Sequence, residues 1–80
     1  MRLPRDISAS ELIRSLKMLG YKETRQVGSH IRLTTVQNGE HHITIPNHDP
    51  IKIGTFSAII GDIAGHFNTS KEDIVKLLWK

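Results

Sequence analysis

The 80-residue chain contains no cysteine, which excludes disulfide bridges, thiolate zinc sites and thiol redox chemistry. It also lacks the run of about 18 to 20 apolar residues that a membrane-spanning helix needs. Residues 1–6 do not form the apolar core of a signal peptide. From these absences we expect a cytoplasmic protein without a membrane partner.

The small size of the chain limits both its core and its chemistry. Eighty residues make one domain, 1–80, and a domain of this size buries only about 60 to 65% of the surface that its unfolded chain exposes. An elaborate multistep enzyme is therefore not expected. The formal charge of +3 favours a polyanionic partner, such as a nucleic acid.

The first helix has clear signals at both ends. Ser8 and Glu11 fit a capping box, in which the serine is the N-cap and the glutamate reaches back to it. Gly20 supplies a left-handed stop after Leu19. Apolar residues recur between these ends at three- and four-residue spacing, which gives one buried stripe: Leu12, Ile13, Leu16 and Leu19.

Three strands are expected next, over residues 21–27, 30–36 and 40–45. The first shows no clean alternation and carries several charges, so we expect an edge strand. Gly28-Ser29 forms the connection to the second strand, with the glycine in the first central position of a primed turn. His30 then begins the second strand.

The register of the second and third strands depends on whether the loop between them has two or three residues. A two-residue loop at 38–39 would pair Leu33 with Thr44 and would place isoleucines on the polar face. A three-residue loop at 37–39, with Gly39 left-handed, pairs Leu33 with Ile43 and keeps the apolar side chains together. We therefore predict the three-residue loop.

The C-terminal third is predicted to be helical after a loop at 46–53. Thr55 is the expected N-cap of the second helix, which ends within 65–68. Its apolar face is the strongest in the chain: Phe56, Ile59, Ile60, Ile63, Ala64 and Phe67. Either Thr69 or Ser70 caps a short last helix that contains Ile74, Leu77 and Leu78.

The resulting order, α-β-β-β-α-α, predicts an α+β fold with two layers. A three-stranded antiparallel sheet has its helices packed on one face, and the other face stays in water. Alternation places one polar and partly cationic set of side chains on that open face: His30, Arg32, Thr34, His42 and Thr44.

Five segments carry a more specific pattern: residues 10–12, 19–21, 25–30, 43–46 and 53–60. Together they resemble the small HicA toxins, which are mRNA interferases of bacterial and archaeal toxin–antitoxin systems. A Gly-Ser-His triplet alone is common. Its position between two strands, followed by Ile-Gly-Thr before a helix, is much more specific, and the resemblance covers nearly the whole chain.

The resemblance implies a fold like that of the double-stranded-RNA-binding domain and a set of site residues. His30 matches the family's catalytic histidine, and Gly28, with Ser29, forms its motif turn. The resemblance also implies a cognate HicB-like antitoxin, which we expect to cover the face that carries His30, Arg32 and His42. The loop at 47–50 is variable in such proteins and receives no functional role.

RNA can be cut without a metal or other cofactor, because its 2′-hydroxyl can attack the adjacent phosphate. His30 is the candidate for removing the hydroxyl proton, since histidine titrates near neutral pH. Arg32 can bind the phosphate with a fork of donors, and Lys52 or Arg25 can add a further charge. His42 is a candidate substrate contact or second proton-transfer group. The substrate would be single-stranded or structured mRNA.

The residues also suggest three other functions. His41, His42 and His48 are the candidates for a metal site. It is disfavoured because His41 and His42 point to opposite faces of a strand, with His41 at the sheet margin, and no carboxylate spacing completes a tetrahedral set. A non-catalytic RNA-binding module of the same fold is the main alternative, although Lys52 is the only lysine near the second helix's start. A DNA-binding factor is disfavoured because no helix carries a base-reading set of side chains.

Overall fold

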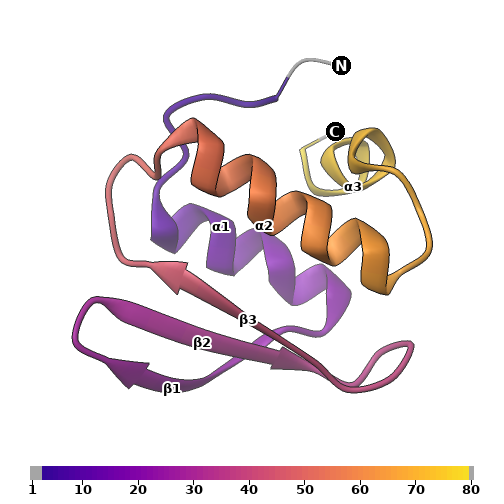
Figure 1. Ribbon diagram of the computed structural model, residues 1–80, viewed down its shortest axis with the longest axis horizontal. Coiled ribbons are helices and arrows are strands. Elements are labelled where there is room, and N and C mark those ends of the chain that lie inside the picture. The colour runs from indigo at the N-terminus through magenta and orange to yellow at the C-terminus, as the bar shows by residue number, and fades with distance from the viewer. Residues whose placement is uncertain (1–2, 80) are drawn as a thin grey trace.

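The computed structural model describes residues 3–79, so Met1, Arg2 and Lys80 lie outside the described residues. The elements in chain order are α1 (Ala9–Leu16), the 3-10 helix η1 (Lys17–Leu19), β1 (Lys22–Val27), β2 (His30–Thr35), β3 (His41–Pro46), α2 (Ile53–His66) and α3 (Lys71–Leu78). The strands form one antiparallel sheet in the order β1-β2-β3. Helices α1 and α2 lie over one face of this sheet (Figure 1), and α3 lies beside α2. The predicted two-layer α+β arrangement, like that of the double-stranded-RNA-binding domain, is confirmed.

The ends of α1 follow the capping signals. The Ser8 hydroxyl accepts a hydrogen bond from the Glu11 amide at 3.1 Å, and Gly20 ends the helical segment with φ of 81°. The last turn, which was predicted as part of one helix, is a separate 3-10 turn. The buried Thr35 hydroxyl donates to the Leu19 carbonyl at 2.7 Å, which ties this turn to the sheet.

The register of β2 and β3 is the predicted one, because Leu33 pairs with Ile43 and Ile31 pairs with Ile45. The connecting loop is longer than predicted and covers residues 36–40, since the ladder ends at the Thr35–His41 pair. The Thr35 hydroxyl accepts from the Gln37 amide at 3.1 Å and so competes with continued pairing.

The two-residue turn at Gly28-Ser29 is confirmed. Val27 and His30 are paired on either side of it, and Gly28 has φ of +58°. The φ of Ser29 is not positive, so the left-handed residue is the first central one, as in a type II′ turn. The turn thus begins β2 at His30.

Helix α2 starts earlier than predicted, because Lys52 and not Thr55 is its N-cap. The buried Ile51 donates its amide to the Ile7 carbonyl at 2.8 Å, which fixes the chain just before the helix. The Phe56 amide then donates to the Lys52 carbonyl at 2.9 Å and closes the first turn. The helix therefore begins directly after this anchor.

Helix α3 is capped by Ser70, the second of the two predicted residues. Its hydroxyl accepts from the Asp73 amide at 3.1 Å, and Lys71 donates to the Ser57 hydroxyl of α2 at 2.9 Å.

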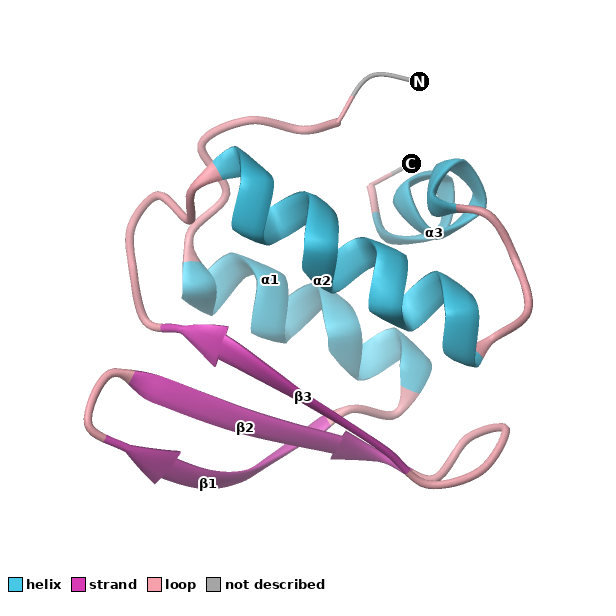
Figure 2. Ribbon diagram, in the orientation of Figure 1, coloured by secondary structure: helices cyan, strands magenta, loops and turns pink. Residues whose placement is uncertain are grey.

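In Figure 2 the helices occupy one layer and the opposite face of the sheet is uncovered. No helix between residues 3 and 79 is both long enough and apolar enough to cross a membrane.

Candidate active site

His30 is the first residue of β2 and lies between both neighbouring strands. It pairs with Val27 of β1 on one side and with Pro46 of β3 on the other. Ile31 and Leu33 of the same strand are buried in the core, so alternation directs His30 and Arg32 to the uncovered face. Among residues 3–79, no side chain bonds to the His30 imidazole, whose two nitrogens are available to a ligand.

Two shallow depressions meet at His30, one on this face and one that reaches from it to the start of α2. The first is lined by Arg25, Val27, His30, Arg32 and Thr44. The second is lined by His30, Thr44, Pro46, His48, Lys52 and Thr55. His30 and Thr44 belong to both, so a ligand that spans the two depressions must pass over the imidazole. We call Arg25, His30, Arg32, His48 and Lys52 the open-face site.

Arg25 reaches the open-face site because of a β-bulge. If the pairing of Lys22 with Thr34 continued without interruption, Arg25 would oppose Ile31 and point into the core. The register shifts between Glu23 and Arg25, so that Arg25 instead opposes Arg32. The bulge therefore places Arg25 opposite Arg32 on the uncovered face, where both line the first depression.

Neither arginine of this pair has a carboxylate partner within the described residues. Two adjacent guanidinium groups with no local counter-charge form a site for an anion, because each presents a planar fork of donors that matches a phosphate. The first depression is therefore chemically suited to a phosphate group beside His30.

The loop after β3 completes the second depression. Its position is fixed by the backbone: the Asn47 amide donates to the Ser29 carbonyl at 2.7 Å, and the His48 carbonyl accepts from the Ala9 amide at 3.1 Å. These bonds hold the loop between the Gly28-Ser29 turn and the start of α1. The His48 side chain, which sequence reasoning left without a role, is exposed and faces the same depression as His30.

Lys52 reaches the second depression from the N-terminus of α2, together with Thr55 of the first turn. This helix has no acidic residue in its first turn and no side-chain cap. Its amide dipoles therefore add to the positive potential that Lys52 creates there.

His42 lies apart from these residues although it is on the same face of the sheet. Its Nδ1 is 2.7 Å from the Thr34 hydroxyl, and its Nε2 is 2.8 Å from a carboxylate oxygen of Glu40. Both nitrogens are thus engaged, and His42 lines neither depression. The structure brings Arg25, Arg32 and Lys52 to His30 and leaves His42 out.

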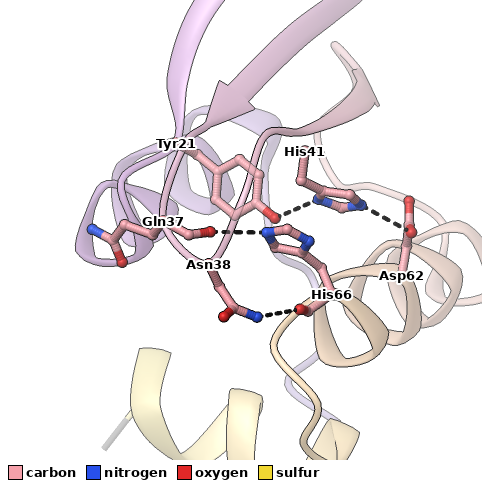
Figure 3. Close-up of polar contacts among 6 residues, drawn as sticks. All are labelled: Tyr21, Gln37, Asn38, His41, Asp62 and His66. Carbon is pink, nitrogen blue, oxygen red and sulfur yellow. Dashed lines mark hydrogen bonds and ion pairs between the residues drawn. The ribbon is translucent and has the colours of Figure 1, made fainter.

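The other two histidines belong to a separate cluster at the far end of the hairpin (Figure 3). His41 lies at the margin of the sheet, where its Nδ1 is 2.7 Å from the Tyr21 hydroxyl and its Nε2 is 3.2 Å from Asp62. Burial, with a smaller contribution from the charge of Asp62, raises the pKa of Tyr21 to about 12. The Asp62 carboxylate can only accept, so Nε2 of His41 carries a proton and donates to Asp62, while Nδ1 contacts the Tyr21 hydroxyl.

His66 ties the same cluster to the hairpin loop. Its ring stacks on that of His41 with 4.3 Å between centroids, and its Nε2 donates to the Gln37 carbonyl at 2.9 Å. Asn38 donates to the His66 carbonyl at 2.8 Å (Figure 3). We call Tyr21, His41, Asp62 and His66 the hairpin clamp, because they fasten the loop between β2 and β3 to α2.

Between residues 3 and 79, no group of three or more His, Asp or Glu side chains is placed to hold a metal ion.

A family comparison covers most of this architecture. The profile described as HicA toxin of bacterial toxin–antitoxin matches residues 9–64, which include the whole sheet and every residue of the open-face site. No curated protein and no solved structure matches the chain significantly. Toxins of such systems act with a cognate antitoxin. From the extent of the family match we conclude that the chain belongs to the HicA toxin family.

Proposed function

We propose that this toxin is a metal-independent endoribonuclease that cleaves mRNA in the cytoplasm, with His30 as the catalytic base. The observation that carries the proposal is the position of His30 where the two depressions meet, with Arg25 and Arg32 on one side and Lys52 on the other. A histidine with free nitrogens beside several unpaired cations suits the metal-free cleavage of a phosphodiester.

The chemistry uses the RNA's own nucleophile. His30 accepts the proton of a 2′-hydroxyl while O2′ attacks the adjacent phosphorus in line with the departing O5′. Arg32 and Arg25 hold the nonbridging oxygens, on which negative charge increases in the transition state, and Lys52 supplies a further charge. The products are a 2′,3′-cyclic phosphate and a 5′-hydroxyl.

The open sheet face suits an extended or structured RNA strand, because no element between residues 3 and 79 covers it (Figure 2). Contacts to phosphates carry no sequence information by themselves. His42, further along the same face, is a candidate contact to a neighbouring part of the strand. Its place outside both depressions argues against a role in proton transfer at the scissile phosphate.

The test compares wild-type protein with His30→Ala on a short labelled RNA in excess chelator. We expect wild-type cleavage to persist and to leave a 2′,3′-cyclic phosphate, and we expect the variant to lose about 100- to 10,000-fold in rate. Lys76→Ala is the control, because Lys76 lies on α3 and pairs with Glu72, away from the open-face site. Activity that requires a divalent ion would contradict the metal-independent mechanism.

The alternative function, a non-catalytic RNA-binding module, gives a different result in the same experiment. Wild-type protein would then bind the RNA and leave it intact, and His30→Ala would change only affinity. Tight binding without any cleavage by fresh wild-type protein would therefore favour the alternative.

We further propose that the cognate antitoxin inhibits the toxin by covering the face with His30, Arg32 and His42. A cationic face attracts an acidic or otherwise complementary partner surface, and its occlusion excludes RNA. Co-purification with the product of the adjacent gene, followed by hydrogen-exchange mapping, tests this. Protection confined to α1 or α3, with cleavage unaffected, would contradict masking.

A further inference from the structure

The five histidines of the chain divide into two groups by their hydrogen bonds. His41, His42 and His66 each bond through at least one ring nitrogen to a named protein group. His30 and His48 have no such side-chain partner among residues 3–79, and both are exposed. The two histidines without partners are also the two that line one depression. This coincidence is unexpected if His48 only fills a surface loop.

The backbone around His48 is fixed, although its side chain is free. The His48 carbonyl accepts from the Ala9 amide, its amide donates to the Pro46 carbonyl at 2.8 Å, and the preceding amide bonds to Ser29. Pro46 is itself the residue that pairs with His30 in the sheet. The loop therefore carries His48 past the start of β2 in a defined place, which is a requirement for a group that must meet a reacting atom.

We propose that His48 is the general acid of the cleavage reaction, an inference that rests on the proposed function. His30 takes the proton from the 2′-hydroxyl, the O2′–P bond forms and the P–O5′ bond breaks. Protonated His48 gives its proton to O5′, which leaves as a hydroxyl. The two histidines finish with their protonation states exchanged, and water restores them, so no metal or other co-reactant takes part.

The charges around the pair allow this division of roles. Lys52 lines the shared depression from the start of α2, and Arg25 and Arg32 face His30 from β1 and β2. Asp49, which follows His48 in the loop, lines neither depression. The base and the acid thus line one depression together with Lys52, and the two arginines face the base from the neighbouring depression, so cations are available for the phosphate without a metal.

The role predicts a specific change in pH dependence. With one histidine acting unprotonated and the other protonated, wild-type kcat/KM should follow a bell-shaped curve. His48→Gln should lose the alkaline limb and about 100-fold or more in rate at neutral pH. Asn47→Ala, one residue away in the same exposed loop, is the matched control and should keep both the rate and the bell shape.

A substrate with a 5′-bridging sulfur distinguishes an acid from a structural residue. A thiolate leaves without protonation because thiols are much more acidic than alcohols, so this substrate should restore His48→Gln to within about tenfold of wild type. His30→Ala should stay inactive on it. Melting temperatures measured in parallel establish that each variant is folded.

The outcomes separate this inference from the proposed function. If wild-type protein cleaves, His30→Ala is inactive and His48→Gln matches wild type on the oxygen substrate, the general-acid role is wrong and the nuclease proposal stands. Loss of activity in His48→Gln without rescue by the sulfur substrate also contradicts the role. If wild-type protein cuts neither substrate, the proposed function fails first.

Discussion

The two histidine-bearing regions of the molecule differ in what surrounds the imidazole. In the hairpin clamp, both nitrogens of His41 bond to protein groups and its ring stacks on His66. In the open-face site, His30 is exposed, bonds to no described side chain and lies between unpaired cations. The imidazole nitrogens of His41 are thus occupied by groups of the protein itself, whereas those of His30 remain available to a ligand.

The difference shows that residue type alone does not assign a role to a histidine. His41 has a tyrosine on one nitrogen and a carboxylate on the other, which resembles a catalytic relay when only the residue types are considered. The tyrosine is buried and its pKa is raised to about 12, so it has neither access to substrate nor a tendency to ionise. A polar network that is built on a buried tyrosine and leaves neither nitrogen of His41 free stabilises the fold instead.

The largest expected effect on stability comes from His41→Ala. The substitution leaves the buried Tyr21 hydroxyl without its partner and removes the stacked ring, so we expect the free energy of unfolding to fall by about 2–3 kcal/mol. Urea denaturation monitored by circular dichroism measures the change.

The adjacent residue provides the matched control for that measurement. His42 is also a β3 histidine, but its bonds to Thr34 and Glu40 are exposed, so His42→Ala should change the free energy of unfolding by less than about 0.5 kcal/mol. Equal destabilisation by the two substitutions would contradict the distinction between the partly buried His41 and the exposed His42.

A smaller effect is expected from the charges of the open-face site. Arg32→Ala should lower kcat/KM about tenfold, because it removes one charge-assisted contact worth about 1.4 kcal/mol to the phosphate. Arg32→Lys should recover only part of the loss, since an ammonium lacks the planar fork. Lys76→Ala removes the same charge from α3 and should leave cleavage unchanged. A similar loss in Lys76→Ala would mean that net charge, not the position of Arg32, governs activity.

The smallest effect concerns the alkaline limit of stability. The pKa of Tyr21 is about 12 in the folded protein, above its ordinary value of 10.0, so the folded state holds this proton more tightly. Stability from this group is fully present below pH 10 and is lost as the pH rises toward 12, by about 1 kcal/mol between pH 10 and pH 11.

Ultraviolet titration can follow the ionisation of the Tyr21 hydroxyl directly, because Tyr21 is the only tyrosine in the chain. The midpoint should lie well above that of the same protein in concentrated urea. Coincident midpoints in the folded and unfolded states would show that the Tyr21 hydroxyl is not buried in the folded protein.

Local patterns in the sequence were sufficient for the elements and for most of the sheet. The Ser8 and Ser70 caps, the Gly28 turn and the pairing of Leu33 with Ile43 all follow from short-range rules. The early start of α2 was missed because it depends on a long-range bond from Ile51 to the N-terminal segment.

The candidate site was predicted less completely, for two physical reasons. The bulge that turns Arg25 outward inserts one residue into a strand without alternation, so nothing in the sequence marks it. His48 was not predicted as a site residue, although the sequence contained a signal for it. The predicted register pairs His30 with Pro46, so the residues that follow Pro46 must pass close to His30. The hairpin clamp joins residues far apart in sequence, which no local pattern reveals.

The comparison of His30→Ala with His41→Ala, each measured for cleavage rate and melting temperature, tests the central claim most directly. We predict that His30→Ala keeps the wild-type melting temperature and loses about 100- to 10,000-fold in cleavage rate. We predict that His41→Ala melts earlier and, per folded molecule, cleaves at the wild-type rate. A folded His30→Ala protein with wild-type cleavage, or a stable His41→Ala protein without cleavage, would contradict the assignment of catalysis to the open-face site.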